Sequence, residues 1–536
     1  MEILHVFAVS MTVCFSSVPW SNAQPDGKPN IVFILADDLD EELGGMKPLL
    51  KTRLLLEDGG MQFTNAYVTT PLCCPSRASI LTGRYAHNAF VRNNTLAGNC
   101  SSTQWQRGTE RLNFAVDLQR AGYETFYAGK YLNQYGHKSA GGVEHVPPGW
   151  DSWNALVGNS VYYNYTISVN GVPEHHGDHP FKDYLTDVIS EKAANFLRPR
   201  TNQSKPFFMF LSPPAPHQPF TPAVRHRNAY NGVQAPRTPS FNVSSNATKH
   251  WLVRQAIHPI PDAVVSWIDE TFRNRWRTLL AVDDLVSEVV GILASKKLLA
   301  STYVFLTSDN GYHLGQFSQP KDKRQPYETD IHVPLLVRGP GIPAGRVEQS
   351  IVLNIDLAPT FLDLAGLPSR EDMDGTSFMS LLVRSGPMAP GRQSFLVEYA
   401  GEGKAQDQSE CHAPYGLASC DPQVQCECED AWNNTFLCTR YIAPTANSKF
   451  CIFHDNEGFV ESYNLANDPH ELRNLFVQPG LCNEDVREHI KCIEQLSQCN
   501  GRECLMNCPP WIPATDVERE LCGFLRMVLR RVCMLM

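Results

Sequence analysis

The chain has few charged residues and no excess of positive charge. Only 19% of its 536 residues are charged, and 46 Lys and Arg stand against 56 Asp and Glu, which gives a formal net charge of −10. This balance excludes the strongly basic surface that is typical of nucleic-acid-binding proteins. The 43% apolar content instead indicates a globular protein with a sizeable core. An anionic substrate would therefore need a locally basic pocket within an acidic protein.

Long hydrophobic runs are also scarce. The run at residues 3–18 is shorter than a membrane-spanning helix, and Ser21 and Ala23 suit cleavage by signal peptidase before Gln24. We therefore predict a secretory signal at residues 1–23, with a buried helix or a membrane anchor as the alternative. We expect no stable membrane insertion, because three arginines interrupt the apolar tail and favour an amphipathic helix packed on the protein.

Cysteine is scarce in the first 400 residues and dense after them. Thirteen of the 17 cysteines lie between Cys411 and Cys533, which predicts a disulfide-stabilised region in an oxidising compartment. A zinc site is the weaker alternative, since a secreted chain usually oxidises such thiols. Sequons for N-glycosylation agree with secretion and occur at Asn93, Asn99, Asn164, Asn202, Asn242, Asn246 and Asn433.

Strand-like apolar runs alternate with amphipathic helical patterns from residue 30 to about residue 366. We predict strands at residues 30–38, 123–131, 206–212 and 302–311, and helices at residues 111–122, 183–197 and 275–298, and the apolar segments 333–341 and 355–367 close the pattern. This alternation predicts an α/β fold with a large mixed, mostly parallel sheet sandwiched between helices. We assign it to a catalytic domain at residues 24–385, followed by a smaller Cys-rich α+β domain at residues 386–536 with an antiparallel sheet and a C-terminal helix.

Polar pairs follow four of the predicted strands. Because ligands usually bind beyond the carboxyl ends of parallel strands, we expect these pairs to converge on one site. The pairs are Asp37-Asp38, Gly129-Lys130, Pro216-His217 and Asp309-Asn310.

Two of these four pairs consist of side chains that offer oxygen ligands. Three carboxylates and one amide suit a hard divalent cation, and a loose set of oxygens favours Ca²⁺. The alternative is that each Asp after a strand caps a helix. The candidate ligands are Asp37, Asp38, Asp309 and Asn310.

Basic side chains supply the candidate anion binders Arg77, Lys130, His217 and Lys323. A tetrahedral anionic ester needs several fixed cations to hold its oxygens as charge develops. Each residue also has an ordinary interpretation, such as a solvated basic turn around Lys323 or a surface histidine among prolines at His217.

One short segment is much more specific. "CCPSRASILTGR", residues 73–84, fits the signature Cys-x-Pro-Ser-Arg-x-x-x-Leu-Thr-Gly-Arg and so resembles the sulfatase family. In that family the first cysteine is converted by the formylglycine-generating enzyme to formylglycine, an aldehyde. The resemblance implies this conversion for Cys73, while Cys74 occupies the variable position and is expected to remain a thiol.

The resemblance extends along nearly the whole chain, through "FYAGKYLNQYG", "TSDNGYHLGQFS" and "DKRQPYETDIHVPLLVRGPG". It implies an alkaline phosphatase/sulfatase-like fold and one Ca²⁺ held by the four oxygen ligands named above together with the group derived from Cys73. It further implies that Arg77 and Lys130 orient the hydrated aldehyde. His217 and Lys323 would grip the sulfate and assist the leaving oxygen, and His313 is a weaker candidate for contact with the sugar.

The chain departs from the family pattern at Leu132. Many sulfatases have a histidine two residues after the lysine that corresponds to Lys130, whereas this sequence reads "GKYLN". Asn133 or a histidine from elsewhere, such as His137, could substitute, although His137 has the character of a surface residue.

The sulfatases that this sequence resembles over the greatest length act on sulfated glycosaminoglycans in the lysosome. The implied reaction is removal of the 6-O-sulfate of N-acetylglucosamine at the non-reducing end of heparan or keratan sulfate, with secretion as an alternative to lysosomal delivery. An extracellular 6-endosulfatase is the closest rival, but the long basic insertion of those enzymes is not found in this sequence. A rival from another class is a glycan-binding protein in which Cys73 is never converted.

Overall fold

The structure is a computed structural model. It describes residues 27–245, 248–383, 391–402, 417–421, 424, 427–476 and 484–510. The predicted signal peptide, the sequon at Asn246, the predicted domain boundary at residue 385 and the apolar C-terminal tail lie outside these residues.

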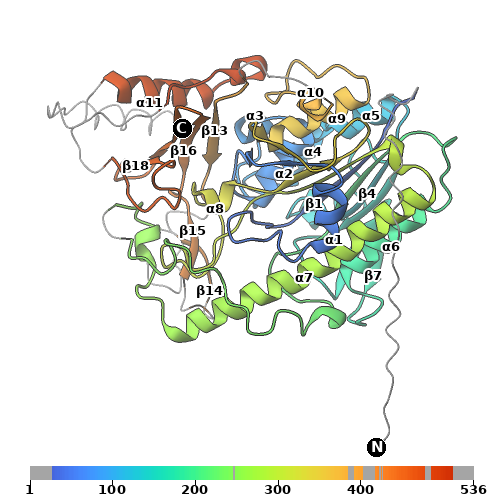
Figure 1. The fold of residues 1–536 in the computed structure, drawn as a ribbon, viewed down its shortest axis with the longest axis horizontal. Coiled ribbons are helices and arrows are strands. Elements are labelled where there is room, and N and C mark those ends of the chain that lie inside the picture. Colours follow the sequence, from blue (N-terminus) through green and yellow to red (C-terminus); the bar gives the residue numbers. More distant parts are fainter. Residues whose placement is uncertain are drawn as a thin grey trace, which may run out of the picture.

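A large mixed sheet forms the centre of the protein (Figure 1). Within the described residues its strand order is β11-β2-β10-β9-β1-β8-β4-β5-β6-β7. The five central strands are mutually parallel and comprise β9 (Thr302–Ser308), β1 (Asn30–Ala36), β8 (Phe207–Ser212), β4 (Glu124–Lys130) and β5 (Ser152–Leu156). The outer strands are mostly antiparallel and comprise β11 (Arg346–Glu348), β2 (Met61–Phe63), β10 (Leu335–Arg338), β6 (Tyr165–Val169) and β7 (Val172–His176). The prediction of a mixed, mostly parallel sheet is confirmed.

Strand β1 shows why the sheet needs helices on both faces. All seven of its residues are buried, and successive side chains point to opposite faces of a strand. Phe33 and Leu35 pack into one hydrophobic core, and Val32 and Ile34 pack into another. A strand that is apolar on both faces is typical of parallel sheets covered on both sides.

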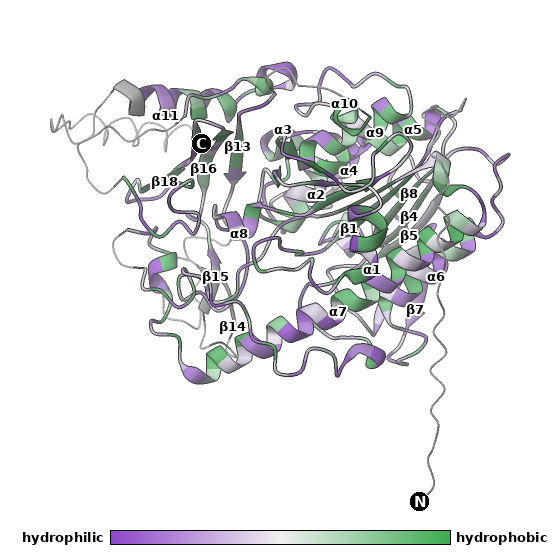
Figure 2. Cartoon of the chain, in the orientation of Figure 1, coloured by the Kyte–Doolittle hydropathy of each residue, from purple (hydrophilic) through white to green (hydrophobic). Residues whose placement is uncertain are grey.

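Two layers of helices supply that cover. One core includes residues of α2 (Cys73–Thr82), α5 (Phe114–Arg120) and α9 (Leu357–Leu364), and the other includes residues of α6 (Leu185–Leu197) and α7 (Asp262–Ser295). Figure 1 shows α6 and α7 on the opposite side of the sheet from α2, α5 and α9. In Figure 2 the central strands are hydrophobic, while α7 alternates between polar and apolar residues.

Helix α7 starts earlier than the sequence predicted. It begins at Asp262, thirteen residues before the expected start. The additional turns bury Val264, Ile268 and Phe272 in a separate small core that lies away from the main sheet. Their spacing of four residues is typical of a helix. The sequence therefore did contain a helical pattern here, but these side chains pack into a different core from those of the predicted part of the helix.

The shorter elements connect these layers. The helical ones are α1 (Leu50–Thr52), the π-helical turn Arg53–Glu57, α3 (Ala86–Ala89), α4 (Thr103–Arg107), α8 (Glu328–Ile331), α10 (Met379–Leu382) and the 3-10 turns Thr109–Leu112, Lys138–Ala140, Val224–His226, Val253–Gln255, Leu299–Ser301, Asn354–Asp356 and Gly501–Leu505. The extended ones are β3 (Ala66–Tyr67), which pairs with β12 (Val352–Leu353), and β14 (Leu417–Asp421), which pairs with β15 (Glu427–Ala431).

A second, antiparallel sheet lies beside the large one, at the left of Figure 1. Its order is β13 (Ser394–Tyr399), β16 (Phe436–Ala443), β17 (Ala446–Phe453) and β18 (Val460–Asn464), and α11 (Glu484–Leu496) packs near it. This confirms the smaller antiparallel sheet predicted for the C-terminal region. Disulfides tie the region together at Cys438–Cys451, Cys492–Cys508 and Cys499–Cys504, so these six cysteines are not zinc ligands.

His87 joins the two parts of the protein. Its Nδ1 lies 2.9 Å from Glu398 Oε1, and its Nε2 lies 3.1 Å from the carbonyl oxygen of Cys499. Because both partners are acceptors, both ring nitrogens must carry a proton. Burial alone would lower the pKa of His87, but Glu398 outweighs it and raises the pKa to about 9.

The sequons differ in exposure. Asn164 and Asn202 are exposed, and Asn93, Asn99 and Asn242 are partly exposed. Asn433 is only 4% exposed, so of the described sequons it is the least accessible, and its glycosylation stays a prediction.

In the part of the chain that is described, no helix combines the length and the apolar character that a membrane crossing requires.

We predict that His87→Ala destabilises the protein more at acid than at alkaline pH. The folded-state pKa of His87 lies above the ordinary value of 6.5, so its contribution is fully present below pH 6.5 and is lost as the pH rises through about 9. Thermal unfolding of both proteins should give a difference of about 1–3 kcal/mol at pH 5–6 that shrinks by pH 9–10. His175→Gln, at an exposed residue of β7, is the control; an equal deficit at all pH values would contradict this account.

Candidate active site

The four polar pairs predicted from the sequence meet at the carboxyl ends of β9, β1, β8 and β4. The Lys130 Nζ at the end of β4 lies 2.9 Å from Asp37 Oδ2 after β1. The backbone N–H of Asp38 donates to Asp309 Oδ1 at 3.0 Å, which joins β1 to β9. His217, from the loop after β8, places its Nε2 3.9 Å from Asp38 Oδ2. Adjacent parallel strands thus bring together residues that are far apart in the sequence.

Each carboxylate of this group is paired with its own cation. Lys130 contacts both oxygens of Asp37, at 3.0 and 2.9 Å. Lys323 Nζ lies 2.8 Å from Asp38 Oδ2. We call Asp37, Asp38, Asp309, Lys130, Lys323 and Arg77 the charge cluster; Arg77 Nε completes it by donating to Asp309 Oδ2 at 2.7 Å.

Burial and charge act against each other on these groups. Burial alone would raise the pKa of Asp37, but Lys130 and His217 hold it well below its usual range. At Asp309 burial prevails over the opposing effect of Arg77 and raises the pKa to about 6. Lys323 is also fully buried, which by itself would lower its pKa, but Asp38 raises the pKa well above its usual value. Lys323 therefore remains a cation.

Helix α2 carries Cys73 and Arg77 into the cluster. The two residues are four positions apart and so share one face of the helix. Cys73 is 0% exposed, and its Sγ lies 3.9 Å from Asp38 Oδ1. Burial raises the pKa of the Cys73 thiol to about 12. Since the thiolate is the reactive form of cysteine, residue 73 is a poor nucleophile as long as it is a cysteine.

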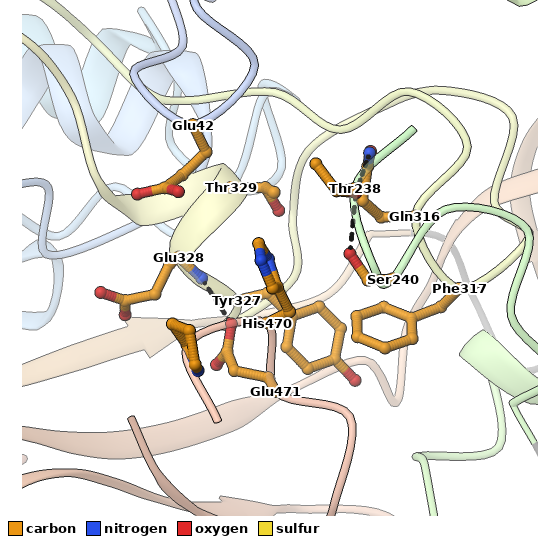
Figure 3. Close-up of a pocket in the computed structure, with 11 residues that line it drawn as sticks. Glu42, Thr238, Ser240, Gln316, Phe317, Tyr327, Glu328, Thr329, His470 and Glu471 are labelled. Carbon is orange, nitrogen blue, oxygen red and sulfur yellow. Dashed lines mark hydrogen bonds between the residues drawn. The ribbon is translucent and has the colours of Figure 1, made fainter. Parts of the chain in front are cut away.

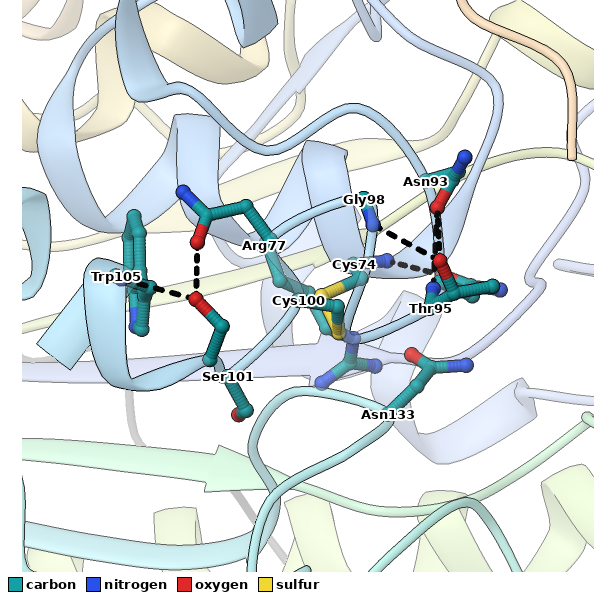
Figure 4. Close-up of a disulfide and its surroundings, with 12 residues drawn as sticks. Cys74, Arg77, Asn93, Thr95, Gly98, Cys100, Ser101, Trp105 and Asn133 are labelled. Carbon is teal, nitrogen blue, oxygen red and sulfur yellow. Dashed lines mark hydrogen bonds between the residues drawn. A yellow bond between two sulfur atoms is a disulfide. The ribbon is translucent and has the colours of Figure 1, made fainter. Parts of the chain in front are cut away.

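Cys74 is not a free thiol, which corrects the sequence prediction. It forms a disulfide with Cys100, as Figure 4 shows, while Cys73 is a free buried cysteine. The pairing could not be found from the sequence, because a chain with sixteen cysteines after its predicted signal allows very many connectivities. Closing a loop of this length stabilises the fold by about 3–4 kcal/mol.

His217 is held in one orientation by the backbone. Its Nδ1 lies 2.6 Å from the carbonyl oxygen of Gln218, so Nδ1 carries the proton and Nε2 faces the charge cluster. Burial lowers the pKa of His217 to about 4, and Asp37 only partly opposes this. In the absence of a bound anion the imidazole is therefore neutral.

A divalent cation fits the donors at this site. Potential ligand atoms of Asp37, Asp38, Cys73 and His217 lie within 4.8 Å of one another. Asn310 Nδ2 donates to Asp38 Oδ1 at 2.7 Å, while its buried Oδ1 has no hydrogen-bond partner among the described residues. A buried amide oxygen without a partner is unfavourable, and a hard cation beside the carboxylates would satisfy it.

His313 lies behind the cluster with one ring nitrogen available. Its Nδ1 is 3.0 Å from Asp330 Oδ1. Its buried Nε2 has no hydrogen-bond partner in the described part of the chain. The backbone of His313 pairs with that of Asp322, the neighbour of Lys323, so the histidine is held next to the loop that carries Lys323.

Leu132, which stands where many sulfatases have a histidine, lies in an apolar environment. Leu132 is 0% exposed and belongs to the main core. Asn133 is 5% exposed and lies among the residues around the Cys74–Cys100 disulfide (Figure 4). Its Oδ1 is buried without a hydrogen-bond partner from the described residues. His137 is exposed and bonds to Ser139, so Asn133 is the better placed of the two substitutes.

Several contacts of the site were missed by the sequence analysis. Ser160, in the loop between β5 and β6, hydrogen-bonds to Asp37. Ser212, the last residue of β8, accepts from Arg77 Nη1 at 2.7 Å. Single serines give no sequence signal. Asn434, from the C-terminal region, donates to the carbonyl oxygen of Arg324 at 3.3 Å, so this region reaches the loop that carries Lys323.

A small pocket lies next to this loop, between α8 and the C-terminal region (Figure 3). Glu328 and Glu471 are among the residues that line it, and the Glu328 N–H donates to Glu471 Oε2 at 2.8 Å. Its volume of about 20 Å³ is enough for one water molecule. This pocket is too small for a sugar, so it is not the substrate site.

Comparisons with known proteins agree with this geometry. The family model described as "Sulfatase" matches residues 29–367. N-acetylglucosamine-6-sulfatase of Capra hircus is 51% identical over 487 residues, which cover 90% of this chain and 86% of that protein. An extracellular sulfatase SULF-1 homolog of Drosophila melanogaster is 42% identical over 392 residues, 72% of this chain and 34% of that protein.

A solved structure shares the fold. It is that of BT4656 in complex with its substrate D-glucosamine-2-N,6-O-disulfate, with a TM-score of 0.69 and 24% identity over 88% of this chain and 98% of that chain.

We predict that a divalent cation stabilises the protein through Asn310. Saturating Ca²⁺ should raise the Tm by about 2–4 °C, and a chelator should reverse the rise. Asn310→Leu removes the amide oxygen and should abolish the shift. Asn195→Leu, at an exposed residue of α6, should keep it. A Tm that does not change on addition of Ca²⁺, Mg²⁺ or chelator would contradict the metal site.

Proposed function

The chain belongs to the sulfatase family and is a sulfuric ester hydrolase, and we propose that it removes the 6-O-sulfate of N-acetylglucosamine at the non-reducing end of heparan or keratan sulfate. The observation that carries this proposal is the 51% identity to the goat N-acetylglucosamine-6-sulfatase over 90% of the chain. An extracellular 6-endosulfatase is the second candidate, supported by the 42% identity to the fly protein. The lower identity and the missing basic insertion make it the weaker one.

We propose that Cys73 is converted to formylglycine. The signature at residues 73–84 supports this, and so does the environment of Cys73. A buried thiol with a pKa of about 12 is protonated at neutral pH and so a poor nucleophile, yet it lies against the charge cluster. After conversion, residue 73 would supply a hydrated aldehyde as the nucleophile toward sulfur.

Arg77 and Lys130 are proposed to orient residue 73. Arg77 shares its helix face and is fixed by Asp309, Ser212 and the carbonyl oxygen of Lys130. Lys130 is fixed by Asp37. Because both cations are locked by partners, they offer preorganised positive charge where negative charge develops.

The oxygens of Asp37, Asp38, Asp309 and Asn310 are the proposed ligands of one Ca²⁺, together with the group at residue 73. The unpartnered Oδ1 of Asn310 supports this set. The ion would supply positive charge that stabilises the sulfate oxygens. His217 lies close to Asp37 and Asp38, so the positive charge of the ion would also act on its imidazole.

His217 and Lys323 are proposed to bind the sulfate and to assist the departing sugar oxygen. Lys323 brings a permanent positive charge. His217 presents Nε2 toward the same point, and a bound sulfate anion would favour the protonated imidazole, which can then pass its proton to the leaving oxygen. His313, with its unpartnered Nε2, is proposed to contact the sugar.

The cellular setting is also a proposal. The predicted signal peptide, the disulfides and the sequons support passage through the secretory pathway. The sulfated glycan substrate favours the lysosome as destination, with secretion as the alternative. The formylglycine-generating enzyme would be the partner during biosynthesis.

We predict that the protein from a eukaryotic secretory host releases sulfate from N-acetylglucosamine 6-sulfate but not from galactose 6-sulfate or N-acetylglucosamine 3-sulfate. Cys73→Ser should lower this rate by about 10³-fold or more, because a serine has one hydroxyl and cannot re-form an aldehyde to expel sulfate. Sulfate release measured by ion chromatography checks both statements.

The control variant is Ser295→Ala, at an exposed residue of α7, which should match the wild type. Release of sulfate from internal units of a heparan oligosaccharide with a modified non-reducing end would favour the endosulfatase. Tight binding of the sulfated sugar without any release would favour the glycan-binding protein. Full turnover by Cys73→Ser would contradict the proposed chemistry.

A further inference from the structure

We propose that the loop Asn93–Cys100, here called the clamp loop, is a positioning device for residue 73. It holds the neighbouring residue, Cys74, at two points, through the backbone and through the side chain. Fixing residue 74 fixes the start of α2 and so aims residue 73 at the charge cluster. The inference rests on the proposed function, because only there is residue 73 the reacting group.

The start of α2 lacks an ordinary cap. The first N–H groups of a helix have no partner within the helix, and an Ncap side chain usually accepts from one of them. Here the Ncap residue is Leu72, which makes no side-chain hydrogen bond, and Pro75 has no N–H to satisfy. The Ser76 N–H is already bonded to the carbonyl oxygen of Leu72 at 3.0 Å.

Asn94 of the clamp loop supplies the missing cap. Its Oδ1 accepts from the Cys74 N–H at 2.9 Å. The cap therefore comes from twenty residues away and not from the helix itself. This arrangement leaves position 72 free to be apolar and buried, and it ties the first turn of α2 to a separate loop.

The Cys74–Cys100 disulfide is the second point of attachment. Both cysteines are 0% exposed. The hydrogen bond holds the backbone N of Cys74 and the disulfide holds its Sγ, and the two attachments come from the two ends of the same loop. Cys74 can therefore neither rotate about the helix axis nor shift along it without breaking one of them.

The clamp loop is itself compact (Figure 4). The Gly98 N–H donates to Thr95 Oγ1 at 2.9 Å, and the Cys100 N–H donates to the Thr95 carbonyl oxygen at 3.0 Å. A Cβ atom at Gly98 would lie 1.8 Å from Asn93 Oδ1, so a larger residue at this position would displace the Asn93 side chain. A loop with these internal contacts can transmit its position to Cys74.

The C-terminal region supports the loop from the other side. The Asn94 N–H donates to Glu402 Oε1 at 2.6 Å, and the Glu402 N–H donates to Asp430 Oδ2 at 2.7 Å. Asn93 Nδ2 lies 3.4 Å from the carbonyl oxygen of Gly401. The Cys-rich region therefore acts on residue 73 through Glu402, Asn94 and Cys74, in that order.

The test compares Asn94→Leu with Asn94→Asp. Both keep the sequon, because Asn93 and Thr95 are unchanged; Leu removes the acceptor oxygen, and Asp retains it at a helix N-terminus that favours negative charge. Asn94→Leu should lower kcat about 10- to 100-fold, as expected for a reacting group misplaced by about 1 Å, with KM changed less than about threefold. Asn94→Asp should restore most of kcat.

A second variant and a second readout separate positioning from folding. Hydrogen exchange at residues 72–77 should be faster in Asn94→Leu than in the wild type, with unchanged exchange elsewhere. The double variant Cys74→Ala with Cys100→Ala should show the same loss of kcat at a temperature where it is folded. Asn195→Leu, at an exposed position, is the control for kcat and for exchange.

The mass of the peptide that carries residue 73 is measured in every sample. A wild type without formylglycine and without activity would refute the proposed function itself. A converted, active wild type matched in kcat by Asn94→Leu and by the double variant would refute the clamp. A loss of kcat that follows lost conversion, with normal exchange at residues 72–77, would refute it as well.

Discussion

Burial of three carboxylates at one point is the constraint on which the rest of the structure depends. Asp37, Asp38 and Asp309 are each no more than 1% exposed, and a buried charge is strongly unfavourable unless it is paired. Lys130, Lys323 and Arg77 provide the pairing. Such a cluster is costly compared with an apolar core, so its presence indicates a function.

The fold explains how the cluster can be built. Parallel strands end at the same edge of a sheet, so each can deliver a polar residue to one point while its apolar residues fill the two cores. For this reason the sequence was sufficient to predict the four strands β9, β1, β8 and β4 and the convergence of Asp37, Lys130, His217 and Asp309. The pattern that marks a buried strand also marks where it ends.

Other features could not be predicted because they depend on contacts between distant segments. The Cys74–Cys100 disulfide, the cap from Asn94 and the bond from Ser160 to Asp37 have no periodic signal. The same holds for the burial of Asn433, which looks like any other sequon in the sequence. In each case the partner is set by how loops pack after the sheet has formed.

The C-terminal region is thus more than an appended domain. It contacts the catalytic part at His87 through Glu398, at Asn94 through Glu402 and at Arg324 through Asn434. These contacts flank the helix with Cys73 and the loop with Lys323. The C-terminal region therefore contacts both the segment that supports Cys73 and the loop that carries Lys323.

The most direct test of this account is the mass of the reduced peptide Leu54–Arg77 from protein made in a eukaryotic secretory host. The account predicts an aldehyde or its hydrate at residue 73, and a Cys74 thiol that appears only after reduction. An unmodified cysteine at residue 73, from cells that convert a control sulfatase, would contradict it.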